Sequence, residues 1–166
     1  SVAIDMLAGR GYEVIAVTGK VESTDYLQSL GAAQVLLRAD IDYGKRPLEA
    51  ARFGGAIDNV GGETLTWLTR TVDNWGNIAS IGLAGGAELK TTVMPFILRG
   101  VNILGINSSA TLRDLRLVVW NRIATDLKPR HLDAIATRTI GFDELPGAFA
   151  AYLQGTVTGR TVVKIG

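Results

Sequence analysis

The sequence predicts a doubly wound α/β domain, in which helices cover both faces of a parallel sheet. Short apolar runs of strand length alternate along the chain with segments of helix length. The connections between these segments are short, and several of them contain glycine. Because parallel strands need crossover connections and become buried beneath them, this alternation favours a parallel sheet.

The first part of the chain begins the alternation. Good helix formers with apolar residues at most positions predict a helix over 1–9, which ends at a glycine. β-branched residues after Gly11 predict a short buried strand over 12–17. The segment 23–30 predicts a helix because it begins at serine and threonine and stops before a glycine, and a strand is expected over 34–37.

The middle of the chain continues the pattern. A weaker helix fits 47–52, and an expected strand over 56–60 is followed by the start of a helix over 64–68. A further strand is expected over 77–81. A proline in the first turn favours a short helix over 94–98.

The last part of the chain completes the sheet and then changes in character. The apolar run 101–106 predicts another strand, at the edge of the sheet, and the longest helix is expected over 112–127. After residue 128 the expected order is strand, helix and strand, over 135–140, 144–154 and 161–165. This tail is consistent with a separate subdomain.

Composition excludes several classes of protein. Seventeen basic and sixteen acidic residues give a formal charge of +1, too balanced for most nucleic-acid or membrane binders. Without cysteine the chain has no disulfide and no thiolate zinc site, and one histidine excludes a polyhistidine metal site. No apolar run reaches the roughly 20 residues that span a bilayer, and the chain opens with neither Met nor a signal pattern. We therefore expect a cytoplasmic fragment that binds a small molecule, and no metal, nucleic acid or membrane.

The loop after the strand at 12–17 carries a candidate phosphate site. Dinucleotide-binding folds place an acid here to bind the adenosine ribose, whereas this chain has Thr18, Gly19 and Lys20. Lys20 supplies a mobile positive charge, Thr18 a hydroxyl, and Gly19 allows a close backbone approach. Arg38, just after the next strand, is a candidate second contact. The alternative is an ordinary polar loop with a solvated arginine nearby.

Three further loops are expected at the carboxyl edge of the sheet, where α/β folds bind ligands. They place small residues and free backbone amides after three strands, at Asn59 and Val60, at Gly82, Leu83 and Ala84, and at Leu104, Gly105, Ile106 and Ser108. The alternative is turn and helix-cap chemistry, in which the glycines only supply backbone freedom.

Other polar and aromatic residues carry no recognisable chemistry. His131 has no matched nucleophile pattern, so hydrolase chemistry is not supported. Asp5, Asp58 and Glu63 have no metal-ligand spacing and are expected to be caps or solvated charges. The three tryptophans, Trp67, Trp75 and Trp120, are expected to fill core or interface space.

Six stretches together resemble one known family. They are VTGK at 17–20, YLQSLGA at 26–32, GAIDNVG at 55–61, GLAGG at 82–86, TTVMPFILRGV at 91–101 and GRTVVK at 159–164. The chain resembles the medium-chain dehydrogenase/reductase superfamily, in its zinc-independent branch of quinone-oxidoreductase-like proteins and acrylyl-CoA reductases. The resemblance implies a Rossmann-type sheet that binds NADP(H) at Thr18–Lys20. It also implies cofactor contacts at Arg38, Leu83, Ile97, Ser108 and Arg160.

The resemblance further implies an activity and an organisation. The expected function is NADPH-dependent reduction of an activated C=C bond, as in an enoyl thioester such as acrylyl-CoA, or of a quinone; the alternative is a noncatalytic nucleotide-binding or assembly module. Residues 1–128 would form the NADP-binding domain, and 129–166 would return to a catalytic domain. A homodimer is expected through the strand at 101–106, since an exposed edge invites pairing.

The chain departs from the family pattern at several points. Lys20 and Asn107 stand where arginine and aspartate are common. The first strand, its glycine-rich loop and the amino-terminal substrate domain are expected upstream of Ser1, so the sheet would have a gap between the strands at 12–17 and 56–60. We expect upstream residues, a neighbouring chain or direct pairing of the two flanking strands to fill it, because buried unpaired backbone groups cost about 1–3 kcal/mol each. Without the glycine-rich loop, these residues alone should bind NADPH poorly.

Overall fold

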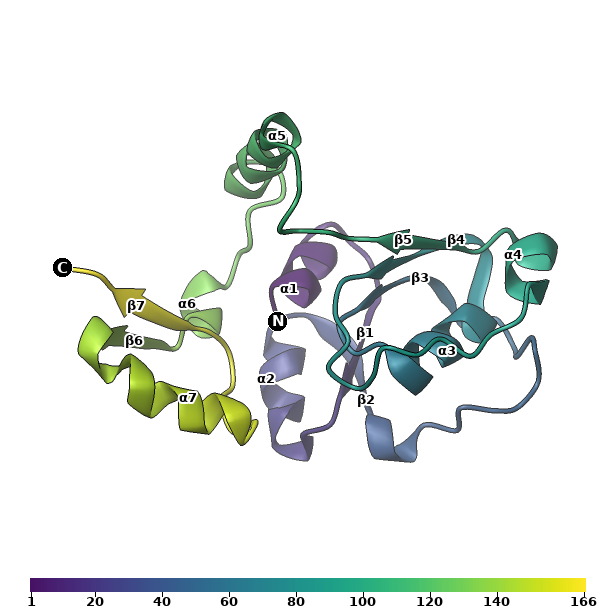
Figure 1. Ribbon diagram of the computed structural model, residues 1–166, viewed down its shortest axis with the longest axis horizontal. Helices are drawn as coiled ribbons and strands as arrows, with labels where there is room; N and C mark the ends of the chain where they lie inside the picture. The colour runs from purple at the N-terminus through teal and green to yellow at the C-terminus, as the bar shows by residue number, and fades with distance from the viewer. The chain divides into compact units, whose positions relative to one another are not determined.

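The computed structural model describes residues 1–166, which form two compact units (Figure 1). Unit 1 consists of Ser1–Ile41 and Leu117–Gly166, and unit 2 consists of Asp42–Arg116. Every strand pair is parallel, and helical segments connect successive strands. The predicted α/β fold with parallel sheets is therefore confirmed.

Strands and helices alternate along most of the chain. The strands are β1 (Val14–Thr18), β2 (Ala32–Leu37), β3 (Phe53–Asp58), β4 (Val72–Ser80), β5 (Asn102–Gly105), β6 (Arg138–Gly141) and β7 (Thr161–Lys164). The helices are α1 (Val2–Gly9), α2 (Thr24–Ser29), α3 (Gly62–Thr71), α4 (Met94–Arg99), α5 (Arg113–Ala124), α6 (Leu132–Ile135) and α7 (Leu145–Leu153). None of these helices is both long enough and apolar enough to cross a lipid bilayer.

The first part of unit 1 is a two-stranded sheet with its helices. β1 and β2 pair in parallel, and α1 and α2 pack against them. Ala16, Leu27 and Ala32 form the buried core, in which small residues on the strands let a leucine from α2 pack closely. In the pairing register Thr18 lies opposite Leu37, so the two strands end at the same level.

The second part of unit 1 contains another parallel pair. β6 and β7 are joined by α7, which lies beside them in Figure 1. A helix is the usual connection between parallel strands because a tight turn cannot reverse the chain twice. Ile135, Ile140 and Ala148 are the buried apolar residues of this part.

A buried carboxylate links the two parts of unit 1. Asp5 of α1 has no exposed surface and accepts hydrogen bonds from the backbone N–H (3.0 Å) and the ring Nδ1 (2.7 Å) of His131. Burial raises the pKa of Asp5, but the hydrogen bonds from His131 outweigh burial and hold the pKa below its usual value. The expectation that Asp5 is a cap or a solvated charge is therefore wrong, because its partner lies 126 residues away in the sequence.

Unit 2 is a three-stranded sheet in the order β3-β4-β5, with α3 packed against β3 and β4. Trp67 of α3 is almost fully buried and meets the rings of Phe53 and Tyr43 edge-on, with centroids 5.3 and 6.0 Å away. Trp75 and Trp120 are exposed, so Trp67 alone of the three tryptophans fills a core. β5 lies at the edge of the sheet, as predicted for the strand at 101–106.

Two expectations about elements differ from the structure, and one alternative for the gap in the sheet is excluded. Residues 47–52 form no helix: the N–H groups of Glu49 and Arg52 instead bond to Arg70 O (3.1 Å) and Thr71 O (2.8 Å), carbonyls that the end of α3 leaves unpaired. The strand expected from residue 135 begins only at Arg138, because residues 132–135 turn into α6. β1 and β3 belong to separate sheets, so direct pairing is not the one of the three expected ways of filling the gap that occurs here.

The Asp5–His131 contact predicts a pH-dependent contribution to stability. A carboxylate whose pKa is lowered by folding stabilises the fold above its unfolded pKa of about 4, and this stabilisation disappears as the pH falls through the folded pKa. Asp5→Asn should therefore lower the free energy of unfolding at pH 7 by about 1–3 kcal/mol, the effect of weakening a buried hydrogen-bonded site. Urea unfolding from pH 7 to pH 3 should show the difference from the wild type shrinking below about pH 4.

Asp133→Asn is the matched control, because Asp133 also lies in the first turn of a helix but is exposed. This variant should change the unfolding free energy by less than about 0.5 kcal/mol. Equal effects of the two substitutions at every pH would contradict a specific contribution from Asp5.

Candidate functional site

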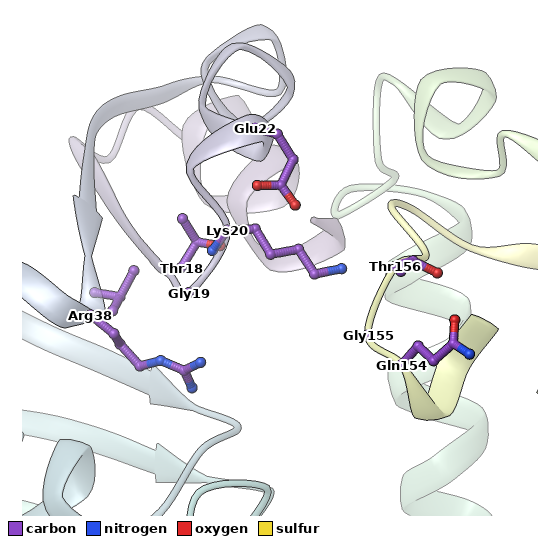
Figure 2. Close-up of a pocket in the computed structure, with 9 residues that line it drawn as sticks. Thr18, Gly19, Lys20, Glu22, Arg38, Gln154, Gly155 and Thr156 are labelled. Atoms are coloured by element: carbon purple, nitrogen blue, oxygen red, sulfur yellow. The ribbon is translucent and has the colours of Figure 1, made fainter. Parts of the chain in front are cut away.

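The aligned ends of β1 and β2 open into a pocket within unit 1. Because Thr18 and Leu37 are paired, the loop that contains Lys20 and the residue after β2, Arg38, leave the sheet at the same level. The pocket has a volume of about 600 Å³ and is open to solvent. Its lining residues, most of them labelled in Figure 2, are Val17, Thr18, Gly19, Lys20, Glu22, Arg38, Gln154, Gly155 and Thr156.

Local hydrogen bonds shape the turn after β1. The backbone N–H of Lys20 donates to Thr18 Oγ1 at 3.1 Å, which closes a small side-chain turn around Gly19. The guanidinium group of Arg38 lies directly over Gly19, where a Cβ atom would collide with it. Gly19 therefore lets Arg38 rest against the turn, and both cations border the same pocket.

Lys20 crosses the pocket toward the C-terminal part of unit 1. Its Nζ donates a hydrogen bond to the carbonyl oxygen of Val157 at 2.9 Å. Figure 2 shows the side chain extending from the turn after β1 toward Thr156. The pocket wall formed by residues 154–156 gave no signal in the sequence, because it depends on this long-range packing.

Glu22 is the acidic residue of the pocket lining. It is exposed, and it stands in the short helical turn that follows Lys20. Its place two residues after Lys20 is a signal that sequence reasoning could have used. The lining thus contains two cationic side chains and one carboxylate, and this charge balance favours an anion.

Unit 2 has its own row of strand ends. Asp58 of β3 pairs with Ser80 of β4, and Ser80 pairs with Gly105 of β5, so three loops begin at one level. The Asp58 carboxylate accepts hydrogen bonds from the N–H groups of Val60 (3.1 Å) and Gly61 (2.9 Å). Asp58 therefore acts as a cap of its own loop, as expected for it from the sequence.

Backbone hydrogen bonds tie these three loops together. The N–H of Ile81 donates to Asp58 O (2.8 Å), and the N–H of Ile106 donates to Ser80 O (2.9 Å). Gly82 lies so close to the backbone of Asn59 that an added Cβ atom would be 2.6 Å from Asn59 O. The predicted residues that the structure brings together along this edge are Asn59, Val60, Gly82, Leu83, Ala84, Leu104, Gly105, Ile106 and Ser108.

The side chains along this edge are mainly apolar and exposed. Leu83, Leu104 and Ile106 are among the exposed large hydrophobic residues of the chain. Beyond them, the side chain of Asn107 accepts hydrogen bonds from Ser109 Oγ (2.9 Å) and the N–H of Ala110 (3.1 Å). Asn107 thus closes its loop on itself, while Ser108 stays exposed beside it.

Two predicted site residues lie elsewhere. Ile97 is on α4, at the start of β5, and therefore at the opposite end of that strand from the loop at residues 106–108. Arg160 lies just before β7 and does not line the pocket. The backbone N–H of Arg160 donates to Ile135 O at 2.6 Å, and its side chain is exposed.

The described residues contain no group of three or more His, Cys, Asp or Glu side chains that could hold a metal ion. His131 is engaged with Asp5 at 2.7 Å. The pocket lining has no cysteine or histidine that could serve as a nucleophile or base. The groups present can therefore bind a ligand. Unit 1 offers cationic side chains, and unit 2 offers backbone groups beside an apolar surface.

Comparison with known proteins places this geometry in a family. A family model described as "Zinc-binding dehydrogenase" matches residues 1–125. The chain belongs to this family. The residues present offer no set of zinc ligands, however, and no chemical role for zinc is derived from them.

Individual relatives fall in the predicted branch of the family. The chain is 47% identical over 166 residues to "Acrylyl-CoA reductase AcuI" of Ruegeria pomeroyi, covering 99% of this chain and 50% of that protein. It is 44% identical over 165 residues to "Putative quinone oxidoreductase YhfP" of Bacillus subtilis, with the same coverage. The chain therefore spans about half the length of the curated relatives it matches.

Solved structures agree with the fold. The structure of Bacillus subtilis yhfP with NAD bound has a TM-score of 0.94 at 44% identity, and covers 99% of this chain and 50% of that one. Escherichia coli K-12 YhdH with bound NADPH has a TM-score of 0.90 at 39% identity, with the same coverage. The resemblance to the quinone-oxidoreductase-like and acrylyl-CoA reductase branch is confirmed, and so is the Rossmann-like fold.

The close packing of the loops in unit 2 predicts a position-specific effect of added methyl groups. Gly82→Ala should lower the free energy of unfolding by about 1–3 kcal/mol, because the new Cβ meets the backbone carbonyl of Asn59, which cannot rotate away. Gly105→Ala is the control at the same edge, since nothing lies within 4 Å of its added Cβ. Urea unfolding should separate the two variants; a Gly105→Ala variant as unstable as Gly82→Ala would refute the packing argument.

Proposed function

We propose that this chain is the cofactor-binding part of an NADPH-dependent oxidoreductase. The observation that carries the proposal is the pocket at the ends of β1 and β2, where Lys20 and Arg38 stand at the point at which NAD-binding folds have an acid. The solved structures of two relatives, one with NAD bound and one with bound NADPH, support a nicotinamide cofactor. We further propose that residues 1–128 form the cofactor domain and that 129–166 return to a catalytic domain.

The pocket residues suit the 2′-phosphate of NADP. Lys20 and Arg38 would neutralise its charge, and the Arg38 guanidinium adds directional N–H donors to the point charge of Lys20. The Thr18 hydroxyl accepts the N–H of Lys20 and keeps its own proton to donate. Glu22 at the rim would oppose a second anion, so it limits how much phosphate charge the pocket accepts.

Other residues would hold the rest of the cofactor. Arg160, exposed just before β7, would add a further positive charge for the cofactor's phosphates. In unit 2, the backbone groups of the tied loops and the exposed Leu83 and Leu104 suit the nicotinamide half, which is partly apolar.

The cofactor itself supplies the hydride when it is bound. The residues of this chain bind and orient it, and none of them is assigned as the proton donor. We propose that the acceptor is an activated C=C bond, as in an enoyl thioester such as acrylyl-CoA, or a quinone. The similarity to the acrylyl-CoA reductase AcuI and to the putative quinone oxidoreductase YhfP supports these two acceptor classes. Zinc takes no part in this proposal.

Calorimetric titration of the intact protein tests the cofactor assignment. The wild type should bind NADP more tightly than NAD, because the pocket offers two cations to the extra phosphate. Lys20→Glu should weaken NADP binding by roughly ten- to a hundredfold, the equivalent of a charge-assisted contact worth about 1.5–3 kcal/mol. The affinity for NAD should change far less, since NAD lacks the 2′-phosphate.

Lys45→Glu controls for the change in net charge, because Lys45 is exposed and lies outside the pocket. It should leave both affinities within about twofold, because Lys45 contributes no group to the pocket lining. A wild type that prefers NAD, or a Lys20→Glu variant with unchanged NADP affinity, would overturn the assignment.

We also propose that the intact protein is a homodimer that pairs through the edge strand β5. β5 ends the sheet order of unit 2, and an edge strand presents unpaired backbone groups to a second copy. Light scattering over a hundredfold dilution should give the mass of a dimer at the higher concentrations. A monomer mass at every concentration would refute it.

A further inference from the structure

The strongest feature that the cofactor assignment does not use is the contact between Lys20 and the α7–β7 loop (residues 154–160). Lys20 Nζ donates to the carbonyl oxygen of Val157 at 2.9 Å, across 137 residues of sequence. Gln154, Gly155 and Thr156 of the same loop line the pocket that also contains Arg38. Figure 2 shows the loop facing the tip of the Lys20 side chain.

We propose that the α7–β7 loop positions Lys20 for phosphate binding, and so helps to set the preference for NADP over NAD. The inference rests on the proposed function, because it assigns a role within the same pocket. A lysine ammonium has three donors and no acceptor. One donor is used by Val157 O, and two are left for the phosphate oxygens.

The loop would act by restricting the lysine side chain before the ligand arrives. A free lysine stem has many rotamers, and ordering them at binding reduces affinity. The Val157 carbonyl is neutral, so it holds the ammonium without cancelling the charge that attracts the phosphate. The loop thus increases the contribution of Lys20 to the preference for NADP over NAD without contacting the phosphate itself. Val157 is thus a positioning residue.

The direction of the Val157 carbonyl depends on how α7 ends. Gly155 has a left-handed φ of +68°, its N–H bonds to Tyr152 O (3.0 Å), and the N–H of Thr156 bonds to Ala151 O (3.1 Å). This pair of bonds is the Schellman motif, which requires the left-handed residue. The Thr156 hydroxyl strengthens it with a bond to Ala151 O at 3.2 Å. Gly155 therefore fixes the direction in which the chain leaves α7.

The end of α1 provides an unusually close control. Gly11 also has a left-handed φ, +83°, and its motif has the same two bonds, from Gly11 N to Ala8 O and from Tyr12 N to Leu7 O. At both glycines an added Cβ meets nothing within 4 Å. Gly11 lies at the far end of β1 from Thr18 and does not line the pocket.

The experiment compares Gly155→Val with Gly11→Val in the intact protein, with NADP and NAD titrated calorimetrically. Both variants force a β-branched residue into a left-handed conformation, so both should lower the melting temperature similarly. Gly155→Val should raise the Kd for NADP by roughly two- to tenfold, the range expected for losing one ordered side chain, and leave the Kd for NAD unchanged. Gly11→Val should change neither Kd.

A double variant separates positioning from a general structural effect. In a Lys20→Met background, Gly155→Val should cause no further loss of NADP affinity, because the loop acts only through Lys20. A further loss there, or equal effects of Gly155→Val and Gly11→Val on the ratio of the two affinities, would overturn the inference. Thr156→Val, which removes only the hydroxyl contact, gives a milder second test should Gly155→Val not fold. Thr156→Val should raise the Kd for NADP and leave the Kd for NAD unchanged. If the variant changes both Kd values by the same factor relative to the wild type, the result again counts against positioning.

Failure of this inference is distinguishable from failure of the proposed function. If the wild type shows no preference for NADP and Lys20→Met has no effect, the cofactor assignment itself is wrong. If the wild type prefers NADP and Lys20→Met weakens NADP binding, but Gly155→Val behaves as Gly11→Val does, only the role of the loop is wrong.

Discussion

Parallel strands that pair in register end at one level, and both candidate ligand regions depend on this alignment. In unit 1 the pairing of Thr18 with Leu37 brings Lys20 and Arg38 to the same edge although eighteen positions separate them in the numbering. In unit 2 the row from Asp58 through Ser80 to Gly105 aligns three loops in the same way. A shift of one residue in either register would reverse which side chains face each way, so the sheet core and the loop positions are specified together.

The two units offer different chemistry at these edges. Unit 1 presents charged side chains that reach into a pocket from separate segments. Unit 2 presents backbone groups, because Gly82 brings one loop into contact with the backbone of Asn59 and leaves no room for a side chain between them. Charged groups suit a phosphate, whereas a rigid backbone surface flanked by Leu83 and Leu104 suits a flat, mostly apolar ring. Each unit therefore presents its own kind of ligand surface at its strand ends.

Most of the fold could be predicted from the sequence because the strands contain short apolar runs separated by loops that often contain glycine, which is a local signal. The turn at Thr18–Lys20 could be predicted for the same reason, because its signal is local. Prediction from the sequence fails where backbone hydrogen bonds come from distant residues. The segment 47–52, for example, hydrogen-bonds to the end of α3 instead of forming a helix. Prediction fails again at Asp5, whose charge is satisfied by His131 far along the chain. Local composition cannot reveal a partner that only tertiary packing supplies.

The same limit applies to the pocket, and it bears on how a lysine rather than an arginine can serve as its mobile cation. Arginine carries its geometry in a planar fork, while lysine is a point charge on a flexible stem of four carbons. A lysine can approach the selectivity of an arginine only if the surrounding structure limits where its ammonium can go. Here the Lys20 ammonium is held by a carbonyl of the α7–β7 loop, which lies outside the local turn, while Gly19 leaves the space in which Arg38 rests against that turn. In the proposed phosphate site, selectivity is therefore a property of the folded unit, and a substitution in the C-terminal segment can alter it without any change to Thr18–Lys20.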